Sequence, residues 1–372
     1  MKNNRVLILG VASVQMEAIL ELKKMGFETY ACAMAKDGPG ADAADHFAKI
    51  NILDIDKIIT FIKDNEISLV YSVGSDIAMP IVSLISERLH LPHFVTNDTA
   101  RVCNNKDLMR KILGNDFRGN VKFQVVKSRK DKLELDFPFI LKPTDSQGQR
   151  GVKLVNNYEE YLEGYEVAKS YSRSGLVILE QYISGPEISV NGYLVNGEIQ
   201  FLVASDRDTW PQFTGLIHKH IVPSKNLNSS QEQDLKTMLE LACKKLKINN
   251  GPVYAQIKLE KGAPYIIEIT PRLDGCHMWN ILKLYTGVNL IKLTFQHLIN
   301  NNISELNNGI EKFKDNYVLE FICQEPNSQA NYSKYDGEML NCLYSFKYYN
   351  QDDLIRPVNG KYEKIGYFIK KI

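Results

Sequence analysis

The sequence predicts an α/β N-terminal domain built on a parallel sheet, followed by α+β domains and a small β-rich C-terminal piece. Residues 1–100 alternate short apolar runs with stretches that carry apolar residues at helical spacing, which is typical of repeated βα units. Residues 136–310 contain runs of strand-like segments interrupted by helical stripes, as in α+β proteins. From Tyr317 onward, short segments rich in Tyr, Phe and Ile predict further strands.

In the N-terminal domain, residues 6–9, 27–32 and 69–73 are the strand-like runs. The stretch after the first run carries apolar residues at i, i+4 and i+7, as on one face of a helix. Consecutive βα units give parallel strands with right-handed crossovers, and ligands then bind beyond the carboxyl ends of the strands. We therefore expect a ligand near residues 10–13 and 72–76.

Composition argues against several functions. The 372 residues carry a formal net charge of +1, so no overall field favours nucleic acid or an anionic membrane. No apolar run approaches the roughly 20 residues that span a bilayer, and the first residues do not resemble a signal peptide. The six cysteines are scattered without a Cys-x-x-Cys pair, which favours free thiols in a reducing cytosol over disulfides or zinc. We therefore expect a cytoplasmic protein that binds neither nucleic acid nor membranes.

The most informative segment is a predicted hairpin over residues 251–272, with two apolar strands around a Lys-Gly turn. If the pairing is centred on Gly262, Gln256 and Glu268 lie opposite each other, with Cβ atoms roughly 5 Å apart. Strand alternation puts Thr270 on the same face. Such an oxygen cluster suits Mg²⁺, which takes one or two protein oxygens and completes its octahedron with substrate phosphates and water. A surface hairpin with incidental polar ends is the alternative.

A glycine-bearing loop follows the predicted strand that ends in Lys142. Gly148 and Gly151 would let backbone N–H groups approach phosphate oxygens closely, and Ser146 can add a donor. The loop does not fit the Walker pattern, and the loop at Gly10 lacks the further glycines of a dinucleotide fingerprint. Alone, the loop after Lys142 is more typical of an ordinary surface loop, and the Gly10 loop argues against NAD binding.

The segment from Glu180 to Glu187 leaves one predicted strand near Ile183 and enters the next. Its backbone can offer N–H and C=O groups to an adenine edge, and Glu187 can accept hydrogen bonds from ribose hydroxyls. Two solvated glutamates at strand ends are the alternative. Arg207 and Lys219 flank an aromatic stretch between strands, where cations could meet a phosphate chain or an acidic substrate.

Five segments follow one another along the chain: Lys106 on a helix, Lys142 after an apolar strand, a small glycine loop, E-Q-Y-I then G-P-E, and Q…E-I-T-P-R at a spacing of 12. In this order they resemble the ATP-grasp superfamily. The resemblance covers nearly the whole chain. It is strongest to stand-alone carboxylate–amine ligases and to the carbamoyl phosphate synthetase and biotin carboxylase branch.

The resemblance implies a role for each motif. The residues that would bind ATP are Lys106, Lys142, Ser146, Gly148, Gly151, Glu180, Gln181, Ile183 and Glu187. The residues that would hold the metal are Gln256, Glu268 and Thr270. The residues that would act in catalysis are Arg272, Lys142 and Arg207. The residues that we place near the substrates, from the fold alone, are Ser75, Asp76, Lys219 and His277.

The implied cofactors are ATP and Mg²⁺, with Mn²⁺ as an alternative, and the implied partners are a small-molecule carboxylate and an amine. The carboxylate would attack the γ-phosphorus to give an acyl phosphate, from which the amine would displace phosphate. Amino acids, small peptides and sugar acids all fit as substrates. Ligases of this group are commonly dimers, so the resemblance also implies a homodimer. No stripe of apolar residues along a predicted helix shows one.

Two positions depart from the family pattern. The first metal position is Gln256 instead of the more frequent Glu, as in the carbamoyl phosphate synthetases, and Thr270 replaces the usual Asn. A neutral amide coordinates through oxygen without adding charge, so the number of bound metal ions is open. These departures keep two alternatives open, a non-catalytic ATP-binding module and a ligase that uses a non-amine acceptor.

The predicted boundaries follow from these segments. We expect the N-terminal α/β domain at residues 1–100 and the ATP-grasp region at residues 101–310. Within that region, residues 101–135 would form a linking helical part, 136–205 a small nucleotide-clamping subdomain, and 206–310 a large subdomain with the metal hairpin. Residues 311–372 would form the β-rich C-terminal segment.

Overall fold

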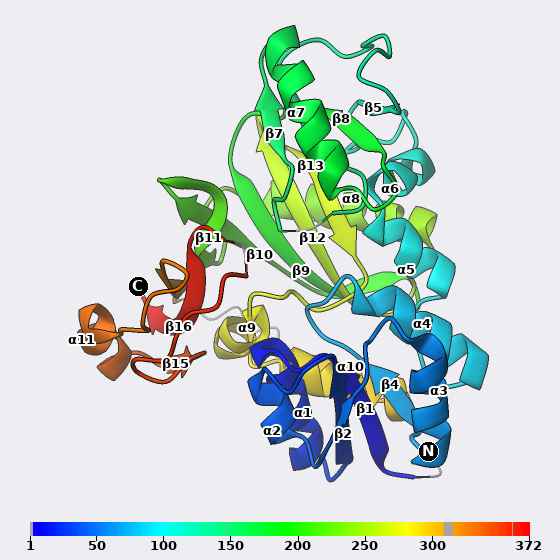
Figure 1. Ribbon diagram of the computed structural model, residues 1–372, viewed down its shortest axis with the longest axis vertical. Helices are drawn as coiled ribbons and strands as arrows, with labels where there is room; N and C mark the ends of the chain where they lie inside the picture. The colour runs from blue at the N-terminus through cyan, green and yellow to red at the C-terminus, as the bar shows by residue number, and fades with distance from the viewer. Residues whose placement is uncertain (1–2, 147, 309–314, 359) are drawn as a thin grey trace.

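The computed structural model describes residues 3–146, 148–308, 315–358 and 360–372, and their strands form three sheets (Figure 1). The first sheet has four strands in the order β3-β2-β1-β4, and all its pairs are parallel. Its strands are β1 (Arg5–Leu9), β2 (Glu28–Ala33), β3 (His46–Lys49) and β4 (Leu69–Tyr71). Its helices are α1 (Ser13–Lys24), α2 (Pro39–Ala43), α3 (Ile55–Asp64) and α4 (Ala78–Leu89). The prediction of a parallel N-terminal sheet is therefore confirmed.

Two helices, α5 (Asn97–Asn104) and α6 (Lys106–Leu113), lead from this domain to a second sheet of four strands in the order β5-β8-β6-β7. These strands are β5 (Phe123–Val126), β6 (Phe139–Pro143), β7 (Lys153–Val155) and β8 (Val177–Gln181), and all their pairs are antiparallel. Helix α7 (Tyr158–Tyr171) packs on one face and buries Phe139 and Leu141. Because side chains alternate along a strand, Ile140 and Lys142 face the other side, which is free to form a site.

The third sheet has eight antiparallel strands in the order β13-β12-β9-β10-β11-β14-β16-β15. Its first five strands along the chain are β9 (Glu187–Val195), β10 (Glu198–Trp210), β11 (Phe213–Val222), β12 (Gly251–Glu260) and β13 (Ala263–Thr270). The C-terminal strands that extend it are β14 (Tyr317–Gln324), β15 (Tyr344–Lys347) and β16 (Glu363–Lys371). The remaining helices are α8 (Ser229–Leu246), α9 (Met278–Thr286), α10 (Leu290–Asn300), α11 (Asp336–Leu340) and two short 3₁₀ turns, η1 (Ser304–Asn308) and η2 (Ser333–Tyr335). The α+β construction and the β-rich C-terminal piece are confirmed.

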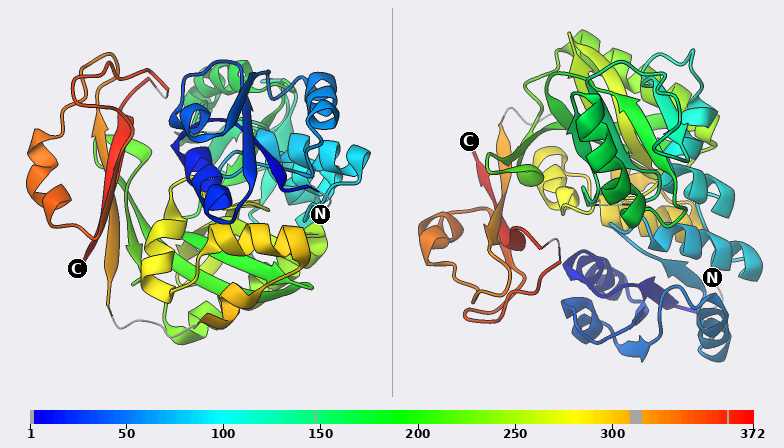
Figure 2. Two further views of the ribbon diagram at one scale, coloured as in Figure 1. Left: turned by 90° about the horizontal axis from the view of Figure 1, so that it is seen from below. Right: turned by 45° about the horizontal axis from the view of Figure 1, so that its top comes forward.

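Helices α9 and α10 join the N-terminal domain to the large sheet. Figure 2 shows these helices, in yellow, between the blue N-terminal domain and the green strands. One hydrophobic core runs through this junction, because Leu7 of β1, Phe295 of α10 and Tyr193 of β9 belong to the same buried cluster. Within the described ranges, no helix has the length and apolarity needed to cross a membrane.

Candidate active site

One cleft of about 890 Å³ lies between the free face of the second sheet and strands β9, β10, β12 and β13 of the third. The residues that the sequence singles out and that line it are Lys106, Lys142, Ser146, Gly148, Glu180, Gln181, Ile183, Glu187, Arg207, Gln256, Glu268 and Arg272. Outside this lining, still within the described residues, are Gly151, Thr270, Ser75, Asp76, Lys219 and His277. Gln147, in the glycine loop, lies outside the described residues. Segments more than 150 residues apart along the chain therefore share one cavity.

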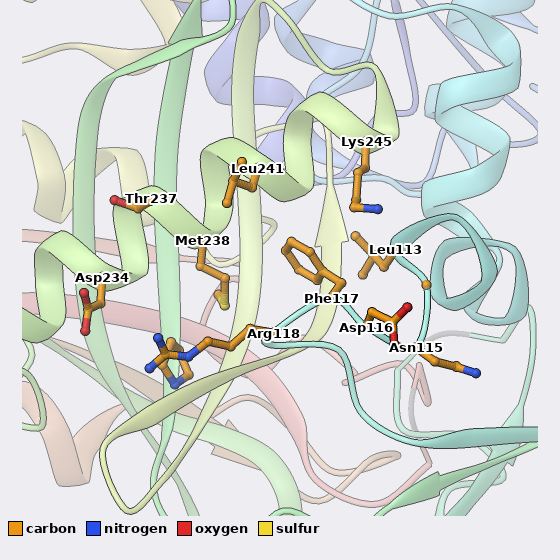
Figure 3. Close-up of a pocket in the computed structure, with 12 residues that line it drawn as sticks. Leu113, Asn115, Asp116, Phe117, Arg118, Asp234, Thr237, Met238, Leu241 and Lys245 are labelled. Carbon is orange, nitrogen blue, oxygen red and sulfur yellow. The ribbon is translucent and has the colours of Figure 1, made fainter.

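A second pocket of about 450 Å³ lies elsewhere, between helix α8 and residues 113–118 (Figure 3). Its walls include the apolar side chains of Phe117, Met238 and Leu241. Among the described residues, none of the predicted site residues lines it. The chemistry of the lining therefore singles out the larger cleft as the candidate active site.

A buried charge triad forms the wall of the cleft on the side of the second sheet. Lys142 Nζ lies 2.7 Å from Glu180 Oε2. Arg110 pairs with Glu180 through two bonds, from Nε to Oε1 at 3.0 Å and from Nη2 to Oε2 at 3.2 Å. Burial alone would raise the pKa of Glu180, but the charges and hydrogen bonds of Arg110 and Lys142 lower it to about 2. The carboxylate is therefore ionised and fixes the direction of the lysine ammonium.

Arg110 is the residue of this wall that the sequence motifs did not single out. It is fully buried. A signal was available, because Arg110 stands four residues after Lys106, and residues at i and i+4 share one face of a helix. On the same helix, Lys106 Nζ donates to the carbonyl of Ser146 at 2.8 Å, so it holds the start of the glycine loop.

The predicted hairpin forms, but its register is set differently from the expectation. The turn is a two-residue one with Lys261 at φ +51° and Gly262 at φ +83°, so the ladder starts from Glu260 opposite Ala263. Continued without interruption, that register would place Gln256 opposite Ile267. A β-bulge shifts it by one residue and brings Gln256 opposite Glu268. The pairing is as expected, but its centring on Gly262 is wrong and the bulge compensates.

Arg110 holds this bulge as well as the triad. Its Nη1 donates to the carbonyl of Ile266 at 2.6 Å, and its Nη2 donates to the carbonyl of Ile267 at 3.2 Å. These contacts satisfy carbonyl groups at the position where the ladder is irregular. One arginine therefore contacts both the charge triad of the second sheet and the hairpin backbone just before Glu268.

The hairpin carries three oxygen-bearing side chains that could hold a metal ion. Gln256 donates through Nε2 to Glu187 Oε1 at 2.7 Å, which leaves its amide oxygen available. Glu268 lines the cleft and is partly exposed. Thr270 is buried, and its Oγ1 has no hydrogen-bond partner within the described part of the chain. An amide, a carboxylate and a hydroxyl oxygen are hard donors, so the set fits Mg²⁺ or Mn²⁺.

The two arginines at the far end of the cleft each have their own carboxylate. Arg207 pairs with Glu187. Arg272 pairs with Asp76 through two bonds, one of them 2.7 Å long from Nη2 to Oδ2, and its Nη1 donates to the carbonyl of Leu273 at 2.9 Å. Asp76 follows β4, so the N-terminal domain supplies the group that orients Arg272.

The other residues placed near the substrates have partners elsewhere. Ser75 Oγ accepts a hydrogen bond from the backbone N–H of Ala78 at 3.3 Å at the start of α4. Lys219 Nζ lies 3.1 Å from a carboxylate oxygen of Glu320 on the neighbouring strand. His277 is buried, with its Nδ1 2.9 Å from Glu17 of α1. Their assignment to a substrate stays a prediction.

Comparisons with known proteins agree with this geometry. Residues 135–279 match the ATP-grasp domain family. The large chain of carbamoyl phosphate synthase from Thermoanaerobacter pseudethanolicus is 23% identical over 207 residues, which are 54% of this chain and 18% of that protein. This chain thus spans about a fifth of the length of the curated relatives that it matches first.

Several solved structures match the fold over nearly the full chain. An L-amino acid ligase from Bacillus licheniformis has a TM-score of 0.84 at 19% identity, with 99% of this chain and 93% of that chain covered. The biotin carboxylase domain of 2-oxoglutarate carboxylase from Hydrogenobacter thermophilus, solved in complex with MgADP and bicarbonate, has a TM-score of 0.78 at 15% identity. That match covers 99% of this chain and 86% of the other. The fold is therefore shared with these proteins over nearly the whole chain.

Proposed function

We propose that this protein is an ATP- and Mg²⁺-dependent ligase that joins a carboxylate to an amine through an acyl phosphate and releases ADP and phosphate. The observation that carries the proposal is the single cleft in which Lys142, Gln256, Glu268 and Arg272 meet. Support comes from the L-amino acid ligase of the same fold and from the neighbouring structure that contains MgADP. Amino acids, small peptides and sugar acids are the candidate substrates.

Each group of side chains in the cleft would have its own role in phosphoryl transfer. Lys142, oriented by Glu180, would hold phosphate oxygens of ATP, and Lys106 would hold the glycine loop against them. Gln256, Glu268 and Thr270 would bind Mg²⁺, which supplies charge neutralisation and alignment of the phosphates when bound. Arg272, fixed by Asp76, would stabilise negative charge on the transferring phosphoryl group.

No side-chain nucleophile is required by this mechanism, because the substrate carboxylate itself attacks the γ-phosphorus. Catalysis then consists of alignment and of charge stabilisation in a site that excludes water. Gly148 at φ +66° and Gly151 at φ +70° adopt left-handed backbone conformations that suit glycine, so the loop can approach phosphates closely. Closure of the loop over the phosphates would protect an acyl phosphate from hydrolysis.

The test uses hydroxylamine as a general trap for acyl phosphates. The purified protein is incubated with ATP, MgCl₂, hydroxylamine and each member of a panel of amino acids, short peptides and sugar acids, and both hydroxamate and ADP are measured. We expect at least one acid to give both products, and Glu268→Ala to abolish them. Glu198→Ala removes an exposed carboxylate outside the cleft lining and is the matched control. ADP formation that is unchanged in Glu268→Ala would refute the metal assignment.

A further inference from the structure

The far end of the cleft holds a cluster that the proposed phosphoryl transfer does not use. His220 of β11 and Asp274 and Cys276, which follow β13, are buried together. A ring nitrogen of His220, a carboxylate oxygen of Asp274 and Sγ of Cys276 all lie within 4.8 Å of one another. Asp274 and Cys276 line the cleft, and His220 lies behind them. We call these three residues the acceptor cluster.

One ring nitrogen of His220 has a hydrogen-bond partner and the other has none. Ser205 Oγ lies 3.2 Å from His220 Nδ1 and 3.3 Å from the carbonyl of Ser189. When the hydroxyl donates to that carbonyl, it accepts from Nδ1, and the neutral ring then leaves Nε2 as an acceptor. His220 Nε2 is buried without a partner among the residues described.

Asp274 presents a second buried acceptor. Its Oδ1 accepts from the backbone N–H of Cys276 at 3.0 Å, whereas Oδ2 has no partner in the described ranges. The nearby arginines do not need Asp274 for charge balance, because each already has a carboxylate of its own. Lys364 of β16 lies 3.6 Å from the sulfur of Cys276.

A buried acceptor without a partner, such as Asp274 Oδ2, needs a hydrogen-bond donor. A primary ammonium group fits, because it carries several N–H donors and one positive charge. A divalent metal fits less well, because the cations of Arg207 and Lys364 lie near the cluster. They repel the two positive charges of a metal ion more strongly than the single charge of an ammonium group.

We propose that Asp274 binds the ammonium group of the acceptor substrate and takes its proton before the attack on the acyl phosphate, with His220 as the positioning residue behind it. The inference rests on the proposed function and specifies its second half. One proton passes from nitrogen to Asp274 Oδ2, and the nitrogen lone pair then forms the C–N bond. The C–O bond to phosphate breaks, and the second proton leaves with the phosphate as HPO₄²⁻.

The electrostatics of the cluster agree with this role. Burial raises the pKa of Asp274 more than Arg272 and Arg207 lower it, so the carboxylate is a stronger base than usual. Burial, followed by the charges of Arg207 and Lys364, lowers the pKa of His220, which therefore stays neutral. Tyr254 of β12 also faces the cluster, and burial raises its pKa and that of the Cys276 thiol within the cluster.

The experiment compares two kinds of acceptor with the acid found by the hydroxamate assay. Hydroxylamine is uncharged near neutral pH and needs no base before it attacks, whereas ammonium and the twenty standard amino acids must first lose a proton. We measure the rate of amide formation from ammonium chloride and from each amino acid, and the rate of hydroxamate formation, in the wild type and in Asp274→Asn. The expected result is a fall of about 10²-fold or more in amide formation, with a far smaller fall in hydroxamate formation.

Further variants separate the role from a structural one. Asp274→Glu should restore part of the lost ratio of amide to hydroxamate, and His220→Gln should lower that ratio less than Asp274→Asn does. Glu198→Ala, outside the cleft lining, should leave the ratio at its wild-type value. An equal loss of both products in Asp274→Asn would overturn the inference.

Three further outcomes would overturn the inference. A wild type that forms hydroxamate but no amide from ammonium or any amino acid overturns the inference alone, and the proposed function stands. A wild type that forms neither hydroxamate nor ADP with any acid overturns both. A thiolate-to-cobalt absorption band on addition of CoCl₂, lost in Cys276→Ser, would make the cluster a metal site and overturn the inference.

Discussion

The two ends of the cleft are built differently. The end at the second sheet, where we propose that ATP binds, is called the nucleotide end. There, Arg110, Glu180 and Lys142 are buried and paired with one another. At the acceptor end, His220 Nε2 and Asp274 Oδ2 are equally buried but have no partner in the part of the chain that is described. The paired end can keep its shape without a ligand, whereas under our proposal the substrate's ammonium group completes the unpaired end. Substitutions should therefore affect stability at the first end and ligand-dependent properties at the second.

The largest effect on stability should come from Arg110→Met. Methionine keeps the length of the side chain, but it leaves the buried carboxylate of Glu180 with Lys142 alone and removes the donors to the bulge carbonyls. Breaking a buried pair in this way costs about 3–5 kcal/mol. Urea denaturation followed by circular dichroism measures the loss.

Arg101→Met is the control for this change. Arg101 is exposed on α5 and lies 3.7 Å from Asp98, so its loss should change the free energy of unfolding by less than about 0.5 kcal/mol. If Arg110→Met cost no more than Arg101→Met, the nucleotide end would not depend on its ion pairs for shape.

The same triad predicts a pH dependence. The pKa of Glu180 is about 2 in the folded protein, below its ordinary value of 4.5, so its ionisation stabilises the fold above pH 4.5. That contribution should be lost as the pH falls from about 4.5 toward about 2. The difference in unfolding free energy between wild type and Glu180→Gln should therefore shrink over this window. A difference that stays constant with pH would mean that Glu180 is not held ionised.

The order of motifs was sufficient to predict residues that the structure brings to one cleft, because local patterns determine their placement. Lys142 ends an apolar strand, and strand alternation directs it away from the face that α7 buries. The Lys-Gly turn predicts the hairpin from its backbone preferences. The bulge was missed because it depends on Arg110, which reaches it from a helix more than 150 residues earlier. No local pattern records that contact.

The acceptor cluster could not be predicted from the sequence. His220 and Asp274 lie on different strands and loops, and neither belongs to a motif. What distinguishes them is the absence of a hydrogen-bond partner among the described residues, which is a property of packing and not of spacing. The pairing of Asp76 with Arg272 could not be predicted either, because it depends on how the N-terminal domain packs against the hairpin.

A smaller loss of stability is expected from a substitution at Gln256, which lies between the two ends of the cleft. Gln256→Glu replaces the donor to Glu187 with a second carboxylate, so without metal the fold should lose about 1–3 kcal/mol. Added MgCl₂ should recover part of this loss, because an ion that binds only the folded state stabilises it. Gln200→Glu, on the exposed face of β10, is the control. Equal melting temperatures of the wild type and Gln256→Glu without Mg²⁺ would contradict the prediction.

The smallest effect should come from Thr270→Val, because the hydroxyl that it removes has no partner within the described residues. Valine has the same shape, so we expect the free energy of unfolding to change by less than about 0.5 kcal/mol. Thr294→Val is the matched control: Thr294 is also buried, but its Oγ1 donates to the carbonyl of Leu290 at 2.7 Å, and its loss should cost about 1 kcal/mol.

The two threonine variants also separate stability from metal binding. If Thr270 Oγ1 is a metal ligand, Thr270→Val should raise the MgCl₂ concentration that gives half-maximal ADP formation, whereas Thr294→Val should leave it unchanged. A loss of stability in Thr270→Val as large as that in Thr294→Val would show that the hydroxyl has a structural partner. An unshifted Mg²⁺ requirement would remove Thr270 from the metal set and leave Gln256 and Glu268 as its protein ligands.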